Sequence, residues 1–87
     1  MCNQLKGIME YKLYDKTRVD CLTDQYAIEV DWAKKWAESI GQSLYYAKIT
    51  HKKPAVVLII GNNDGRFLHR LKVVAEIYNI KIFTIDK

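Results

Sequence analysis

Three carboxylates, Asp20, Glu29 and Asp31, lie in one stretch of the chain that also favours β-strands. Two strand residues separated by two positions point to the same face, so Glu29 and Asp31 would share a side. Asp20 would lie on the neighbouring strand and could meet them at one end of a two-stranded ribbon. A hard divalent ion such as Mg²⁺ prefers carboxylate oxygens, and it makes a bound water a better nucleophile towards a phosphoryl group. The pattern therefore indicates metal-assisted hydrolysis.

The same acids also have an ordinary explanation. Asp20 could pair with Arg18 on the surface of a strand, and Asp31 could act only as a helix cap. Acidic residues are unfavourable inside strands, however, so three of them on two neighbouring strands call for a reason. From the acids alone, a metal site and a solvated surface both stay open.

A helix expected directly after the acids carries a polar stripe. At about 100° per residue, Gln42 and Tyr46 each fall within roughly 20° of Lys35. Lys34 points about 100° away from Lys35 and is the second choice for a lysine that reaches the acids. The stripe could also be the plain polar surface of an amphipathic helix, whose core face would be formed by Ala33, Trp36, Ala37, Ile40, Leu44 and Ala47.

The hydrophobic periodicity predicts an α/β fold in the order βββαβαβ. An antiparallel three-stranded meander would be followed by a crossover helix and a parallel strand, which gives a mixed β-sheet. The apolar run at 55–60 is typical of a central strand covered on both faces, and the last strand would lie at an edge. We expect strands at 8–14, 18–23, 26–32, 55–60 and 80–85, and helices at 33–50 and 66–78.

This arrangement resembles the PD-(D/E)XK nuclease superfamily, which has a restriction-endonuclease-like core. Asp20 matches the aspartate of its motif, and Glu29 matches the acidic residue of the second half. The segment from Gln42 to Tyr46 matches the QxxxY motif of the RecB-like branch. The resemblance covers residues 8 to about 60 and implies a metal-dependent nuclease that hydrolyses phosphodiester bonds in DNA with Mg²⁺ or Mn²⁺.

The resemblance also implies roles for individual residues. Asp20 and Glu29 would bind the metal with help from Asp31, and Lys35 would support the attacking water and the transition state. The remaining two residues of the stripe, Gln42 and Tyr46, would position the lysine, the water or a phosphate.

Two departures from the superfamily pattern support an alternative. Asp31 occupies the position of the motif lysine, and only seven residues precede the first strand, where relatives usually carry a helix. The alternative is a catalytically inactive remnant of the fold that acts as a DNA-binding or dimerisation module. An unrelated α/β domain that binds a small ligand is a third interpretation.

Length and charge fit these expectations. A chain of 87 residues indicates a single domain with a small core, for which a homodimer would add buried surface. The net charge of +4 is consistent with DNA as a partner, and Lys34, Lys52 and Lys53 are candidates for phosphate contacts.

The sequence also predicts the surroundings of the two cysteines, the two tryptophans and Gly41. Cys2 and Cys21 lack metal-ligand spacing and are expected to be reduced thiols of a cytoplasmic protein, which has no apolar signal or membrane segment. Trp32, like Trp36, is expected in the core rather than as a platform for stacked bases. Gly41, inside the helix, would be explained by a close approach of the helix backbone to the sheet.

Overall fold

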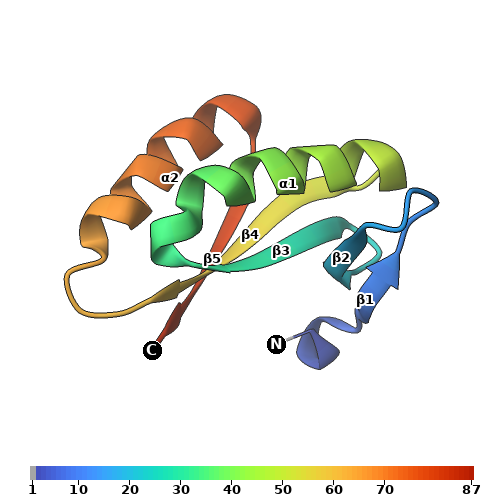
Figure 1. The fold of residues 1–87 in the computed structure, drawn as a ribbon, viewed down its shortest axis with the longest axis horizontal. Coiled ribbons are helices and arrows are strands. Elements are labelled where there is room, and N and C mark those ends of the chain that lie inside the picture. Colours follow the sequence, from blue (N-terminus) through green and yellow to red (C-terminus); the bar gives the residue numbers. More distant parts are fainter. Residues whose placement is uncertain (1) are drawn as a thin grey trace.

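The computed structural model describes residues 2–87 and contains five strands, two α-helices and two short 3₁₀ helices (Figure 1). The order of strands and α-helices is the one that the sequence predicts, with bounds that shift by up to three residues. The elements are η1 (Asn3–Leu5), β1 (Ile8–Lys12), β2 (Arg18–Leu22), β3 (Tyr26–Trp32), η2 (Ala33–Lys35), α1 (Trp36–Thr50), β4 (Lys53–Ile60), α2 (Gly65–Tyr78) and β5 (Lys81–Asp86).

The five strands form one mixed sheet in chain order, which confirms the α/β prediction. β1, β2 and β3 pair antiparallel, whereas β3, β4 and β5 run parallel. Parallel neighbours need a crossover connection, and the two α-helices provide it. β5 lies at an edge of the sheet, as expected.

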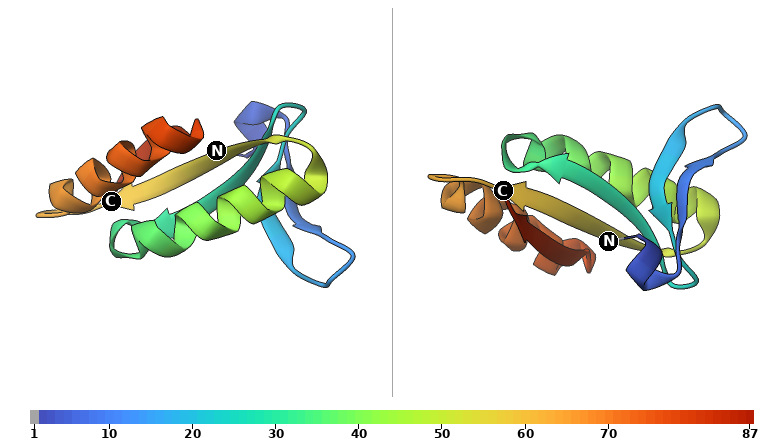
Figure 2. Two further views of the ribbon diagram at one scale, coloured as in Figure 1. Left: turned by 90° about the horizontal axis from the view of Figure 1, so that it is seen from above. Right: turned by 90° about the horizontal axis from the view of Figure 1, so that it is seen from below.

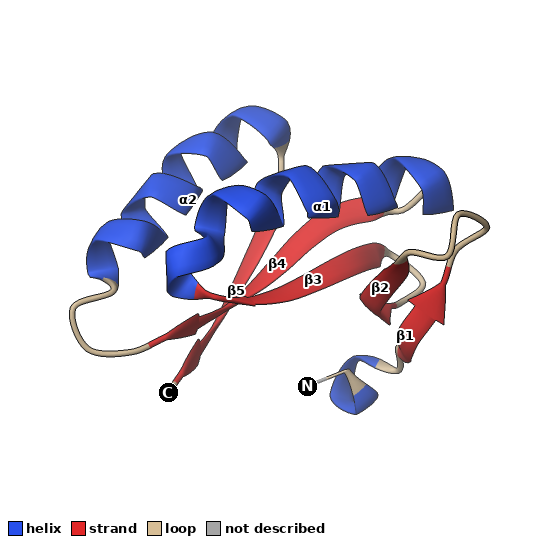
Figure 3. Cartoon of the chain, viewed as in Figure 1, coloured by secondary structure: helices blue, strands red, loops and turns tan. Residues whose placement is uncertain are grey.

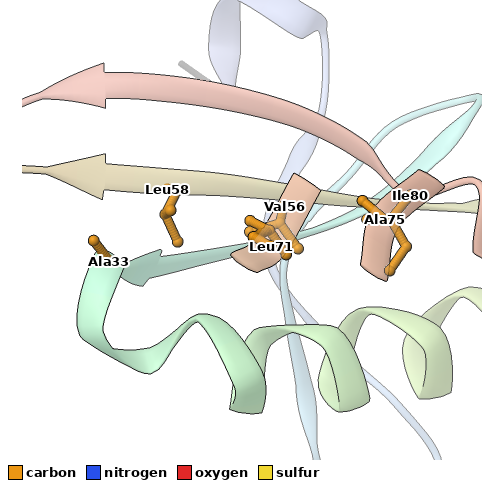
Figure 4. Packing of buried hydrophobic residues seen from close by; sticks show 6 residues of the cluster. All are labelled: Ala33, Val56, Leu58, Leu71, Ala75 and Ile80. Carbon is orange, nitrogen blue, oxygen red and sulfur yellow. The ribbon is translucent and has the colours of Figure 1, made fainter. Parts of the chain in front are cut away.

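Both α-helices cover the same face of the sheet (Figures 2 and 3). Alternate residues of β4, among them Val56 and Leu58, point to this face and meet Leu71 of α2. All three side chains are fully buried, and burial of each stabilises the fold by about 1.5–3 kcal/mol. Figure 4 shows the cluster that they form with Ala33, Ala75 and Ile80.

The opposite face of β4 is covered at one end by the start of the chain. Ala55 and Val57 pack with Ile28 and with a disulfide between Cys2 and Cys21. The expectation of two reduced thiols is therefore wrong. The chain folds back after η1 and brings the two Cα atoms to 5.8 Å, a proximity that spacing in the sequence does not reveal.

Gly7 explains how this reversal is possible. A Cβ atom at Gly7 would lie 2.5 Å from the Cys21 sulfur and 2.7 Å from the Cys2 sulfur. Only glycine lets the backbone pass so close to the disulfide.

Five of the six residues predicted for the core face pack as expected, namely Ala33, Trp36, Ile40, Leu44 and Ala47, but the buried face is shifted so that two serines join it. Ser39 and Ser43 are fully buried, and their hydroxyls donate to the backbone carbonyls three residues earlier. Ala37, expected in the core, is exposed. The physical reason is that residues 33–35 form a 3₁₀ turn instead of the first turn of the α-helix. A 3₁₀ helix turns by about 20° more per residue than an α-helix, so these three residues rotate the following helix by roughly 60°. The explanation for Gly41 is also wrong, because a Cβ atom there would meet nothing within 4 Å.

The two tryptophans have different environments. Trp36 packs against the helix-side core, as predicted. Trp32 is 48% exposed, which corrects the expectation of a core position. Trp32 is the last residue of β3. Its side chain points to the face of the sheet that carries no α-helix, so no helix buries it.

Candidate functional site

The ladder between β2 and β3 ends where Asp20 comes opposite Glu29. The paired residues of this ladder are Leu22 with Ala27 and Cys21 with Ile28. Beyond these pairs, a side chain of β2 bonds to the backbone of β3: Oδ2 of Asp20 accepts a hydrogen bond of 2.8 Å from the backbone N–H of Val30. This bond turns the Asp20 carboxylate towards β3.

Glu29 is the most deeply buried acid of the site. It is buried, with 6% of its surface exposed, and its Oε1 has no hydrogen-bond partner among residues 2–87. Burial is the largest cause that raises the pKa of Glu29, to about 8, followed by the charge and close contact of Asp20 and then by the charges of Asp31 and Glu10. A buried carboxylate without a partner is costly, so a cation here would be stabilising.

Asp31 and Lys35 lie at the other end of the acid cluster. Burial raises the pKa of Asp31, the positive charge of Lys35 lowers it, and the charges of Asp20 and Glu38 raise it again. Lys35 is thus close enough to act on the acids electrostatically. The structure places Asp20 beside Glu29, and Asp31 within electrostatic range of Asp20 and Lys35. A single site formed by all four residues stays a prediction.

Tyr46 and Gln42 of α1 differ in their positions. Tyr46 is buried at 8% exposure, and burial followed by the charges of Glu29 and Asp20 raises the pKa of its hydroxyl. It therefore lies against the acids. Gln42 lies on the exposed side of α1, and its role in the site stays a prediction.

Two further acids act on the site, of which the sequence left the role of Glu10 open and gave no role to Glu38. Glu10, on β1, adopts a left-handed backbone with φ of 53° and adds its charge to that felt by Glu29. Glu38 lies in the first turn of α1 and acts on Asp31. The spacing of Glu38 one helical turn after Lys35 was the available signal, since residues three apart are neighbours on a helix.

The β1–β2 turn is anchored to the same helix. Asp15 accepts hydrogen bonds from the backbone N–H of Thr17 at 3.0 Å and from its hydroxyl at 2.5 Å. It also accepts one from the hydroxyl of Tyr45 on α1. These bonds lower the pKa of Asp15, with Thr17 as the first cause. The turn is thereby fixed beside the helix that covers the acids.

The lysines proposed for phosphate contacts lie at two ends of the sheet. Lys34 lies in η2, just after β3, and is exposed. Lys53 begins β4 at the opposite end, where it pairs with Tyr26, and Lys52 directly precedes it. The ammonium group of Lys52 donates to the carbonyl of Asp24 at 2.9 Å.

The donor set suits a hard cation. In the described part of the chain, no three acidic, histidine or cysteine side chains are placed as a ready metal cage. Mg²⁺ typically uses one or two protein carboxylates and keeps several waters. Asp20 together with Glu29, whose Oε1 lacks any partner, fits that requirement.

Fold and site together define a small α/β domain with a partly buried carboxylate cluster. The chain is 27% identical over 81 residues to a protein of Acanthamoeba polyphaga mimivirus that is named as KilA-N domain-containing. The match covers 93% of this chain and 22% of that protein, so the chain spans about a fifth of the relative's length. No family model matches the chain, and no solved structure matches it.

Neither α-helix of residues 2–87 is long and apolar enough to span a membrane.

Proposed function

We propose that the domain hydrolyses phosphodiester bonds in DNA with the help of Mg²⁺ or Mn²⁺. The observation that carries the proposal is the carboxylate of Glu29, which is buried beside Asp20 and whose Oε1 has no hydrogen-bond partner within residues 2–87. A divalent cation would supply that partner and reduce the repulsion between the two acids. The resemblance of the surrounding sequence to PD-(D/E)XK nucleases supports the same assignment.

In this proposal Asp20 and Glu29 hold the metal, with Asp31 assisting. The ion, when bound, neutralises charge on a phosphoryl oxygen and acidifies a bound water. Lys35 orients the attacking water and stabilises the negative charge that develops at phosphorus. The water would give up a proton to solvent and its oxygen would form a bond to phosphorus, while the bond to the leaving sugar oxygen breaks and that oxygen takes up a proton from solvent.

The other residues would position the substrate. Tyr46 packs over the acids and limits their exposure, and Gln42 on the open side of α1 would meet the DNA backbone. Lys34, Lys52 and Lys53 would bind phosphates as point charges.

Calorimetric titration with Mn²⁺ tests the metal site. Wild-type protein should bind Mn²⁺, and Asp20→Asn and Glu29→Gln, which keep the side-chain shapes, should lose most of the binding. Asp24→Asn is a matched control, because Asp24 is an exposed acid in the β2–β3 turn. Loss of binding in the control as well would point to a diffuse charge effect and count against a defined site.

Cleavage of plasmid and single-stranded DNA with Mg²⁺ tests the chemistry. Glu29→Gln and Asp20→Asn should be inactive. Lys35→Met should keep Mn²⁺ binding while cleavage falls by a factor of about 10²–10⁴, the range for a residue that acts in proton transfer or charge stabilisation. Wild-type cleavage rates in pure Glu29→Gln would remove the assignment.

The second candidate is a catalytically inactive module that binds DNA or dimerises. It is favoured by Asp31, which occupies the position of the motif lysine. Such a module should show DNA binding or self-association without carboxylate-dependent Mn²⁺ binding. The homodimer itself stays a prediction, which sedimentation velocity tests.

A further inference from the structure

A hollow of about 800 Å³ lies where the three parallel strands end. It is bordered by the last residue of β3, the loop between β4 and α2, and the end of β5, which lie on one side of the molecule (Figure 1). Its volume falls in the range of about 300–1,000 Å³ that is typical of ligand sites. The carboxyl ends of parallel strands are also where open α/β sheets commonly bind ligands.

Trp32 gives the hollow an aromatic wall. Its side chain is half exposed, and the ammonium group of Lys87 lies 5.3 Å from the centre of its ring. Lys87 is held in place because its backbone N–H donates to the carbonyl of Ile60 at 2.8 Å. The ammonium group lies over the indole ring, and the exposed part of the ring is a surface on which a flat ring can stack.

The polar groups of the hollow complement a nucleotide. Lys34 and Lys87 supply two positive charges, and the exposed Asn62 supplies an amide that can both donate and accept hydrogen bonds. Of the two carboxylates in the lining, that of Asp64 is already used, because its Oδ2 accepts the N–H of Gly61 at 2.7 Å. The exposed Asp86 is the carboxylate left to accept hydrogen bonds from a base.

We propose that this hollow binds an unpaired base of single-stranded DNA, stacked on Trp32, with the neighbouring phosphates against Lys34 and Lys87. The choice of DNA rests on the proposed nuclease function. Asp31 and Trp32 are successive residues at the end of β3 and point to opposite faces of the sheet, so a strand that reaches both the acids and the hollow must pass around this end of β3. A base inside a duplex is stacked on its neighbours and cannot offer its face to the indole.

Fluorescence anisotropy of a short labelled oligothymidylate in EDTA tests this inference without cleavage. Trp32→Ala should weaken binding about ten-fold or more, as expected when a stacked base loses its aromatic platform. Trp32→Phe should keep much of the affinity, and Lys34→Met should weaken it and reduce its dependence on salt. Tyr78→Ala is the matched control, because Tyr78 is an exposed aromatic residue at the far end of α2 and should have no effect.

The outcomes separate this inference from the proposed function. Equal affinities of wild-type protein and folded Trp32→Ala would overturn the hollow as a base site, and so would a lack of any oligothymidylate binding at low salt. An equal loss for Trp32→Ala on a blunt duplex would also overturn it, since the inference requires an unpaired base. Trp32-dependent binding without cleavage in Mg²⁺ would instead overturn the nuclease and leave the hollow in place.

Discussion

The pKa of Glu29 predicts that the stability of the metal-free protein falls as pH rises from about 5 to about 8. In the folded protein burial raises this pKa from 4.5 to about 8, with Asp20 as the next cause. Between these two values the unfolded chain has lost a proton that the folded protein keeps. The contribution is therefore fully present below pH 4.5 and is lost as pH rises through about 8.

The magnitude follows from the linkage relation. One bound proton corresponds to a slope of about 1.4 kcal/mol per pH unit. The slope multiplied by the pKa shift gives an upper limit for the change in the free energy of unfolding. Because part of the acid cluster is open to water, we expect a smaller total change, on the order of 3 kcal/mol. This is a large share of the roughly 5–15 kcal/mol that stabilises a small domain.

Urea denaturation of wild-type protein and Glu29→Gln between pH 5.5 and 8.5 measures the effect. The wild-type midpoint should fall by about 2 M over this range if the slope in urea is about 1–1.5 kcal/mol per molar. The midpoint of Glu29→Gln should change much less, and the variant should be the more stable protein at pH 8.5. Asp24→Asn controls for a general effect of removing one negative charge.

A divalent cation should reverse the trend. Millimolar Mn²⁺ should restore stability to wild-type protein at pH 8, because the ion takes the place of the proton on Glu29 and offsets the repulsion from Asp20. It should do little for Glu29→Gln. Parallel pH curves for the two proteins without metal would refute the reasoning, because they would mean that Glu29 is solvated or paired in solution.

Two further predictions concern stability alone. Gly41→Ala should stabilise the protein by about 0.5–1 kcal/mol and raise the melting temperature by several degrees, since the site is helical and open; a lower melting temperature by circular dichroism would contradict this. Reduction of the disulfide between Cys2 and Cys21, or the double change to serine, should cost about 3 kcal/mol, because the bridge closes a loop with a sequence separation of 19. An unchanged urea midpoint in dithiothreitol would mean that the bridge does not form in solution.

The sequence predicted the sheet well because each strand carries a local signal. The segment Tyr26–Trp32 alternates, and the apolar run that starts at Ala55 has the length and composition of a buried strand. Alternation also places Glu29 and Asp31 on one face, so the meeting of the acids could be predicted from local geometry.

Features that depend on the path of the chain could not be predicted in this way. The 3₁₀ turn at Ala33–Lys35 shifts the phase of α1, which places Ser39 and Ser43 against the sheet. The disulfide depends on a reversal at Gly7 that no spacing rule describes. The exposure of Trp32 depends on both helices covering the other face.

The packing of α1 on β3 argues that Glu29 is kept for function. Next to it in the sheet, Ile28 and Val56 are fully buried apolar residues, and an apolar residue at position 29 would fit the same pattern. On α1, the buried Ser39 and Ser43 have their hydroxyls bonded to carbonyls of their own helix. A fold that buries an acid beside a second acid, with an Oε1 that has no partner among residues 2–87, gives up stability at that point, and such a loss is typical of sites where the group is needed for binding or chemistry. Both the nuclease and the inactive module must account for this acid, and metal binding is the measurement that decides between them.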